Sequence, residues 1–256
     1  MSELIDSHSH IDAARFDTDR GAVLERARAA GVTRQIVPAV ALSGFDKLRM
    51  LCAGEPGLFP AYGLHPMFIT EHRPADLDEL TSWVEREGPV AVGECGLDFY
   101  IDDSDRERQR TCFRRQVQLA HDAGLPLILH ARRALDEVIA ELRRISGLRG
   151  VVHSFSGSQE QARELWRLGF CIGIGGPVTY ERAKRLRGIV ADMPIEFLLL
   201  ETDSPDQPLC GHRGERNEPA RLADVLGTVA TLRNADIGSI AAATTRNAGR
   251  VFRLPV

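Results

Sequence analysis

Short, uniformly apolar runs alternate with longer amphipathic stretches along almost the whole chain. Continuous apolar runs are typical of strands that are buried on both faces, as in a parallel sheet. Between them, apolar residues recur every three or four positions, which is typical of helices with one buried face. We expect eight strands, near residues 4–6, 35–40, 58–63, 90–94, 127–130, 150–153, 170–174 and 197–201.

The amphipathic stretches predict helices between and after these strands. Asp19 is expected to cap the first helix, and Ser158 begins a capping-box pattern that ends at Gln161. Gly173–Gly176 does not match G-x-G-x-x-G, which makes a dinucleotide-binding fold the weaker alternative. The helices are expected near residues 20–30, 44–53, 77–84, 106–123, 134–145, 158–168, 219–233 and 237–250.

Strands that alternate with helices predict parallel βα units. No linker rich in proline or serine interrupts the pattern, and no shift in composition marks a domain boundary. We therefore predict an α/β fold, a single (β/α)8 TIM barrel that forms one domain over residues 1–256. In such barrels the active site lies at the C-terminal ends of the strands.

Two histidines follow the first expected strand. In an extended backbone, side chains two positions apart point to the same side, so His8 and His10 face one way together. Two imidazoles in this arrangement suit a metal cation. By itself the His-x-His pattern is weak and favours two solvated histidines at the end of a strand, so it becomes informative only if further ligands follow later strands.

Such candidate ligands do follow later strands. His65 follows the third strand, but it is not counted among them. Four imidazoles and two carboxylates, without cysteine, suit Zn²⁺, Mn²⁺ or Co²⁺ better than Ca²⁺. Six ligands exceed the three of a usual catalytic zinc, so they divide more naturally over two ions. Glu94 would then bridge, with His8, His10 and Asp203 on one ion and the other two histidines on the second. The candidate ligands are His8, His10, Glu94, His130, His153 and Asp203.

Composition and charge limit the possible function classes. The chain has 256 residues and a net charge of −4, so there is no overall basic surface for duplex nucleic acid. Its five cysteines are widely spaced and form no C-x-x-C motif, which favours reduced thiols in the cytoplasm. We see no signal peptide, no apolar run long enough to cross a membrane, and no obligate protein partner.

In combination these motifs resemble the TatD family of metal-dependent deoxyribonucleases, within the amidohydrolase superfamily, and most of all its YjjV branch. The resemblance covers nearly the whole chain. It implies that the six candidate ligands hold two divalent ions (Mg²⁺, Mn²⁺ or Zn²⁺), and that the activity is hydrolysis of phosphodiester bonds by an exonuclease. The motifs are Asp6–His10, Gly63–Pro66, Gly93–Asp98, Leu129–His130, His153–Gly157, Glu201–Pro205 and Arg216–Pro219.

The resemblance also suggests further roles. Asp203 can take a proton from a metal-bridging hydroxide as general base, and His65 is expected to contact a phosphate or the leaving group, unless it is structural. Arg132 and Arg133 are candidates to clamp a phosphate, and Arg213 and Arg216 to guide the backbone, unless all four are merely solvated. Cys95 occupies a position where an aliphatic residue is expected, and we interpret it as part of the core.

Aromatic residues after the third and fourth strands are candidates to stack on a terminal base. They are Phe68, Phe99 and Tyr100, although core packing is the favoured role for the two phenylalanines. The remaining histidines, His72, His121 and His212, are expected at the surface.

Three functions are therefore compared. The favoured one is a metal-dependent nuclease that acts on single-stranded DNA or another phosphodiester. The second is a dinuclear hydrolase of a small ester, lactone or amide, because the same metal geometry supports both reactions. A non-enzymatic scaffold is disfavoured, because six buried ligands without metal would remain unsatisfied.

Overall fold

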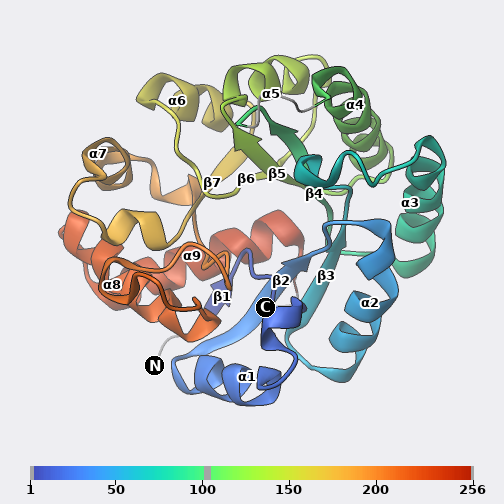
Figure 1. The fold of residues 1–256 in the computed structure, drawn as a ribbon. Helices are drawn as coiled ribbons and strands as arrows, with labels where there is room; N and C mark the ends of the chain where they lie inside the picture. Colours follow the sequence, from blue (N-terminus) through green and yellow to red (C-terminus); the bar gives the residue numbers. More distant parts are fainter. Residues whose placement is uncertain (1–2, 101–104, 255–256) are drawn as a thin grey trace.

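Eight parallel strands form the centre of the molecule, and helices surround them (Figure 1). This computed structural model describes residues 3–100 and 105–254. Neighbouring strands pair in sequence order from the first to the eighth. They are β1 (Leu4–Asp6), β2 (Val32–Pro38), β3 (Leu58–Tyr62), β4 (Ala91–Asp98), β5 (Leu127–Arg132), β6 (Gly150–Val152), β7 (Phe170–Ile174) and β8 (Leu198–Leu200).

The helices confirm most of the predicted pattern. They are α1 (Arg20–Ala29), α2 (Phe45–Gly54), α3 (Pro74–Glu87), α4 (Arg106–Asp122), α5 (Leu135–Leu142), α6 (Gln159–Arg167), α7 (Lys184–Asp192), α8 (Leu222–Leu232) and α9 (Ile237–Phe252). The sequence did not predict α7. Its pattern is weak because Ile189 and Val190 are its only fully buried residues, and Gly188 interrupts it. None of the helices in the described part of the chain is long and apolar enough to cross a membrane.

Bonds just beyond β1 and β8 bring the two ends of the sheet together. The amide of Ser7 donates to the carbonyl of Leu200 at 3.0 Å, and the amide of Asp203 donates to the carbonyl of His8 at 2.9 Å. The buried carboxylate of Asp6 also accepts hydrogen bonds from the amide and the hydroxyl of Thr202. These contacts complete the (β/α)8 barrel that the sequence predicted.

Helix α9 closes one end of the barrel. Its apolar residues Val251 and Phe252 pack against the ends of the strands, in a cluster that includes Ile5 and Ile128. Phe252 is buried, so this end is filled with side chains. Substrate can therefore reach the barrel only from the opposite end, where the strands have their C-termini.

Three local expectations can be compared with the structure. Cys95 is fully buried in the core, as expected. Asp19 occupies the N-cap position of α1, but its side chain makes no capping bond because it pairs with Arg216 instead. His72 was wrongly expected at the surface: it is buried, and its Nε2 lies 2.9 Å from the carbonyl oxygen of His65.

Candidate metal centre

The carboxylate of Glu94 lies at the centre of the open end of the barrel. Glu94 belongs to β4, all eight residues of which are buried. A close approach of the neighbouring strand holds it in place: a Cβ at Gly63 would come within 2.6 Å of the Gly93 backbone and 2.8 Å of the Glu94 carbonyl. Only glycine at position 63 permits this spacing, so the residue after β3 helps to position the carboxylate.

One oxygen of Glu94 faces the two histidines that follow β1. Its Oε2 lies 3.2 Å from His8 Nε2 and 3.3 Å from His10 Nε2. The two ring nitrogens are themselves 3.1 Å apart. Asp203 Oδ1 approaches the same atoms, at 3.5 Å from His8 and 3.7 Å from His10. This group contains the same residues as the first of the two ligand sets expected from the sequence.

The other oxygen of Glu94 faces the histidines that come from β5 and from just after β6. Its Oε1 lies 3.1 Å from His130 Nδ1 and 2.8 Å from His153 Nε2. These two nitrogens are 3.3 Å apart. The carboxylate therefore separates two groups of ligand atoms, which is the arrangement that a bridging role requires.

His65 reaches the same carboxylate in a different way. Its Nε2 lies 2.8 Å from Glu94 Oε1, and its Nδ1 accepts a hydrogen bond from the amide of Met67. A nitrogen that accepts carries no proton, so in the neutral ring Nε2 is protonated and donates to Glu94. Burial lowers the pKa of His65 to about 4, which keeps the ring neutral at pH 7. With both nitrogens engaged, His65 acts as a donor to Glu94, although the ligand atoms of His65, Glu94 and His130 also lie within 4.8 Å of one another.

Asp98 fixes the orientation of His130. Its Oδ2 lies 2.9 Å from His130 Nε2, so the ring donates that proton and turns Nδ1 toward Glu94. Asp98 is at the end of β4, four residues beyond Glu94 and therefore on the same face of the strand. The sequence contained this signal, but Asp98 was not assigned a role.

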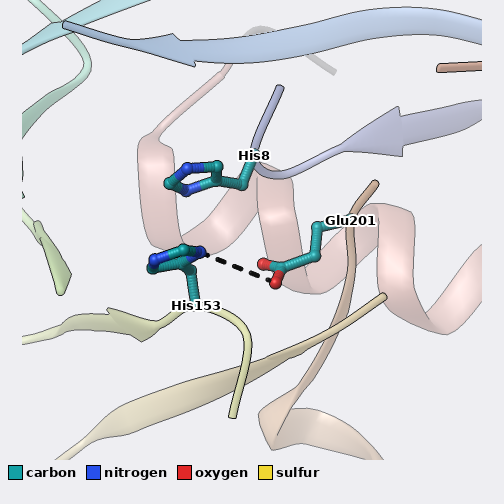
Figure 2. Close-up of side chains that lie close together, drawn as sticks. All are labelled: His8, His153 and Glu201. Carbon is teal, nitrogen blue, oxygen red and sulfur yellow. Dashed lines mark ion pairs between the residues drawn. The ribbon is translucent and has the colours of Figure 1, made fainter. Parts of the chain in front are cut away.

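Glu201 lies behind His153. Figure 2 shows its carboxylate directed at His153, while the ring of His8 stacks on that of His153 at a centroid distance of 3.9 Å. Glu201 Oε1 is 3.9 Å from His153 Nδ1 and accepts a hydrogen bond from the amide of Ser154. Burial raises the pKa of Glu201 to about 8. Gly173 leaves the space for this side chain, because a Cβ there would overlap the carboxylate.

The charges of the cluster are strongly coupled through Glu94. Burial raises the pKa of Glu94, but the imidazoles of His65, His153 and His8 outweigh it and hold the pKa well below its usual value. Burial likewise lowers the pKa of His10 and His153, yet the adjacent carboxylate raises them to about 9 and about 10. Burial dominates at His8, whose pKa falls well below its usual value.

This donor set fits divalent cations. Glu94 Oε2 is buried without a hydrogen bond among the described residues, although two imidazole nitrogens lie beside it. A cation between these atoms would satisfy all three. The ligand atoms of His8, His10 and Glu94 lie within 4.8 Å of one another, as do those of His8, His153 and Glu201. Imidazole and carboxylate ligands suit Zn²⁺ or Mn²⁺, and carboxylates also suit Mg²⁺.

Asp203 is held by a residue that the sequence did not point to. Gln207 donates from Nε2 to Asp203 Oδ2 and to the hydroxyl of Ser154. The opposite oxygen of Asp203 is the one that faces His8 and His10. Both Asp203 and Gln207 have positive φ angles, of 53° and 49°. No local sequence pattern indicated this turn, so the interaction was missed.

A cavity of about 990 Å³ opens above the cluster. Its lining includes His65, Arg132 and Asp203. The guanidinium of Arg132 lies 3.5 Å from the centroid of the Tyr100 ring, and that of Arg133 lies 4.6 Å from it.

The two arginines of the long loop after β8 lie apart from this cavity. Arg216 forms two hydrogen bonds with Asp19 and one with the carbonyl of Arg15. Arg213 is exposed, and neither residue lines the cavity.

The sequence as a whole can be compared with known proteins. The model of the TatD related DNase family matches residues 5–253. The chain belongs to this family. YjjV of Escherichia coli K12, described as an uncharacterized metal-dependent hydrolase, is 41% identical over the full length of both chains. The crystal structure of YjjV, a TatD homologue, superposes with a TM-score of 0.95 and 40% identity over 98% of each chain.

A more distant family member has a more specific description. The 3′-5′ ssDNA/RNA exonuclease TatD of Klebsiella pneumoniae is 33% identical over 99% of each chain. These comparisons confirm the predicted family and the resemblance to YjjV. The chain is thus a metal-dependent hydrolase of the TatD family, and so an enzyme.

Proposed function

We propose that this TatD-family hydrolase is a deoxyribonuclease that removes terminal nucleotides from single-stranded DNA. It would hold two divalent ions, Mg²⁺, Mn²⁺ or Zn²⁺, bridged by Glu94. The other ligands would be His8, His10, His130, His153 and Asp203. We further propose that residues 1–256 act as one cytoplasmic catalytic domain without an obligate protein partner.

The charge of the cavity supports a phosphodiester substrate. Beyond Glu94 and Asp203, the acidic residues of its lining are Asp12 and Asp206. Its basic lining residues are Arg15, Arg132, Arg182, Lys184 and Arg185. The chain as a whole has a net charge of −4, so this excess of positive charge is local. This positive charge would not help to bind a neutral ester or lactone, whereas it would attract the negative charge of a phosphodiester.

The residues of the site have distinct tasks in this reaction. Divalent ions, when bound, would lower the pKa of a water molecule and offset the charge of the phosphoryl oxygens. Asp203 would accept a proton from the attacking water as general base. His65 donates its Nε2 proton to Glu94, and with metal bound to that carboxylate it would instead donate to a phosphate or leaving-group oxygen. Arg132 can bind phosphate oxygens in a bidentate manner.

Attack at the end of a strand needs a groove that is closed on one side. The loop after β8 carries Pro205, Asp206 and Gln207 into the lining of the cavity. We propose that this loop is the wall, and that Arg213 and Arg216 stabilise it or guide the strand. The description of the Klebsiella pneumoniae relative as a 3′-5′ exonuclease supports terminal attack.

The decisive experiment compares substrates with one metal-loaded preparation. We would measure kcat/KM for a short single-stranded oligonucleotide and for a panel of lactones and neutral esters. Arg132→Ala and Arg133→Ala should reduce oligonucleotide turnover far more than ester turnover, whereas Arg246→Ala, on α9 at the closed end, should affect neither. If the neutral substrates are turned over faster by orders of magnitude, the enzyme is instead a hydrolase of small esters, lactones or amides.

A further inference from the structure

We infer that two opposite walls of the cavity recognise single-stranded nucleic acid, one by binding its phosphates and the other by binding its terminal base. Arg182, Lys184 and Arg185 would bind backbone phosphates, and Phe68 would stack on the terminal base. This inference rests on the proposed nuclease function and names the residues that select its substrate.

The two walls face each other because of the order of the strands. In an eight-stranded barrel, β3 and β7 are four positions apart and so lie on opposite sides, as Figure 1 shows. Phe68 belongs to the short 3-10 helix η3 (Pro66–Phe68), which follows β3. The basic segment 182–185 follows β7 and leads into α7. Both line the cavity that holds Glu94 and His153, so a bound strand would cross the metal centre between them.

The basic wall consists of cations without acidic partners. Arg182, Lys184 and Arg185 are exposed, and among the described residues none of them lies within 4.0 Å of a carboxylate oxygen. Most arginines elsewhere are neutralised: Arg143 pairs with Glu164 at 2.9 Å and Arg216 with Asp19 at 2.6 Å. Charges that a protein leaves unpaired at the mouth of a cavity are available to an anionic ligand.

Contacts on both sides hold this wall in place. Arg185 donates from Nη2 to the carbonyl of Ser156 at 2.8 Å, which ties the segment to the loop after β6. The hydroxyl of Tyr180 donates to the carbonyl of Pro208 at 2.9 Å, which ties it to the loop after β8. The three cations therefore keep their place at the cavity, and a bound phosphate need not order the segment first.

The number of charges indicates a chain of phosphates. One phosphodiester has a single negative charge, and Arg132 on the side of β5 already serves the scissile group in the proposed function. Three further cations within four residues exceed what one small diester can use. A strand that continues past the metal centre would bring successive phosphates to them.

The opposite wall offers an aromatic ring. Phe68 is half-buried and lines the cavity, where its ring meets His65 edge to face at a centroid distance of 5.9 Å. Phe99, by contrast, is buried in the core and does not line the cavity. An aromatic ring in a cavity beside the metal centre can stack on any base, which suits an exonuclease without sequence preference.

The first test removes the cations. We would prepare Lys184→Ala, the triple variant Arg182→Ala/Lys184→Ala/Arg185→Ala, and Arg246→Ala as the matched control. The readout is the ratio of kcat/KM for oligo-dT to kcat/KM for bis(p-nitrophenyl) phosphate. We expect this ratio to fall by about tenfold or more in the triple variant and to stay unchanged in the control. The slope of log(kcat/KM) against log[salt] should also become shallower, by about 0.7 for each phosphate that the variant no longer binds.

The second test concerns the base. Phe68→Leu keeps an apolar side chain but removes the aromatic face. We expect about a fivefold or greater loss of kcat/KM with ordinary oligo-dT, the lower end of the range for a stacked base. Phe68→Tyr, which keeps an aromatic ring, should retain the wild-type kcat/KM. We would also use oligonucleotides that lack the base of the 3′ or the 5′ terminal residue. When the missing base is at the end that is attacked, wild type and Phe68→Leu should have equal kcat/KM.

A binding measurement separates this inference from the proposed function. We would follow the fluorescence anisotropy of labelled oligo-dT with metal-free protein, which needs no turnover. If wild type binds but never cleaves, and the triple variant binds more weakly, the inferred binding role of the cations is correct and the nuclease function is wrong. If wild type cleaves but neither set of variants alters the ratio, the salt slope or the affinity, the inferred role of the two walls in recognition is wrong. Absence of both binding and cleavage would overturn both.

Discussion

Asp98 and His130 are joined by a hydrogen bond of 2.9 Å between Oδ2 and Nε2. This bond decides which nitrogen of His130 faces the metal centre, because a ring that donates from Nε2 keeps its lone pair on Nδ1. Nδ1 lies 3.1 Å from Glu94 Oε1. The two carboxylates of β4 therefore have complementary proposed roles: Glu94 would hold the cations, and Asp98 orients one of their proposed ligands.

Loss of Asp98 should weaken metal binding. Asp98→Ala removes the acceptor for His130 Nε2, and we expect the affinity for one of the two ions to fall by about 10- to 100-fold, the usual effect of such supporting contacts. Asp98→Asn keeps an acceptor oxygen, so its metal affinity should lie between those of wild type and Asp98→Ala. Calorimetric titration with Mn²⁺ or Zn²⁺ measures both affinities. Equal affinities in wild type and Asp98→Ala would show that His130 needs no such support or is not a ligand.

The bridging role of Glu94 can be tested by stoichiometry. Saturated wild-type protein should contain two ions per chain, and Glu94→Ala should lose most of both, since one oxygen faces each group of histidines. The control is Glu160→Ala, which removes an exposed carboxylate of α6. Metal analysis after removal of free ions gives the result. A single ion in the wild type, unaffected by Glu94→Ala, would contradict the bridge.

The parts of this site that could be predicted from the sequence are those that follow from strand periodicity. His8, His130, His153 and Asp203 stand where apolar runs end, and parallel strands bring such positions together at one end of a barrel. Glu94 was placed correctly beside them, although β4 continues four residues beyond it, to Asp98. The fold was predictable for the same reason, because several strands are continuous apolar runs.

Contacts that depend on loop geometry could not be predicted. Gln207 reaches Asp203 through a turn with positive φ angles, and the amphipathic pattern of α7 was too weak to place Lys184 at the cavity. Arg216 shows the same limit. It was a candidate for substrate contact, yet its guanidinium is bound to Asp19, a residue 197 positions away.

Metal uptake should depend strongly on pH. In the metal-free protein the Glu94 carboxylate outweighs burial and raises the pKa of His10 to about 9 and that of His153 to about 10, so both rings are protonated at pH 7. A cation must displace these protons, and its affinity therefore rises with pH and levels off only above these values. With up to two protons displaced, we expect the affinity to increase about 10- to 100-fold from pH 7 to pH 8.

Competition with a chelator of known pH dependence gives this affinity, and calorimetry in buffers of different ionisation enthalpy counts the protons released. Glu94→Ala offers a comparison for the metal-free rings themselves, because without that carboxylate the pKa values of His10 and His153 should fall in an NMR titration. An affinity that is constant between pH 6 and pH 8 would show that the rings are already neutral.

The last prediction concerns the chemistry of Asp203. Asp203→Asn keeps a side chain of the same shape and an oxygen toward His8 and His10, but it removes the negative charge and the basic oxygen. We expect kcat to fall by at least about 100-fold at saturating metal, the scale of general acid–base catalysis. The fold should persist, because the bond that ties this segment to β1 comes from the Asp203 amide and not from the side chain. Asp78→Asn, an exposed carboxylate on α3, is the control for the substitution itself. Turnover of a metal-loaded variant, measured together with its thermal unfolding, distinguishes a catalytic role from a structural one. Near-normal kcat at saturating metal would refute the role of Asp203 as base, even if more metal were needed to reach it.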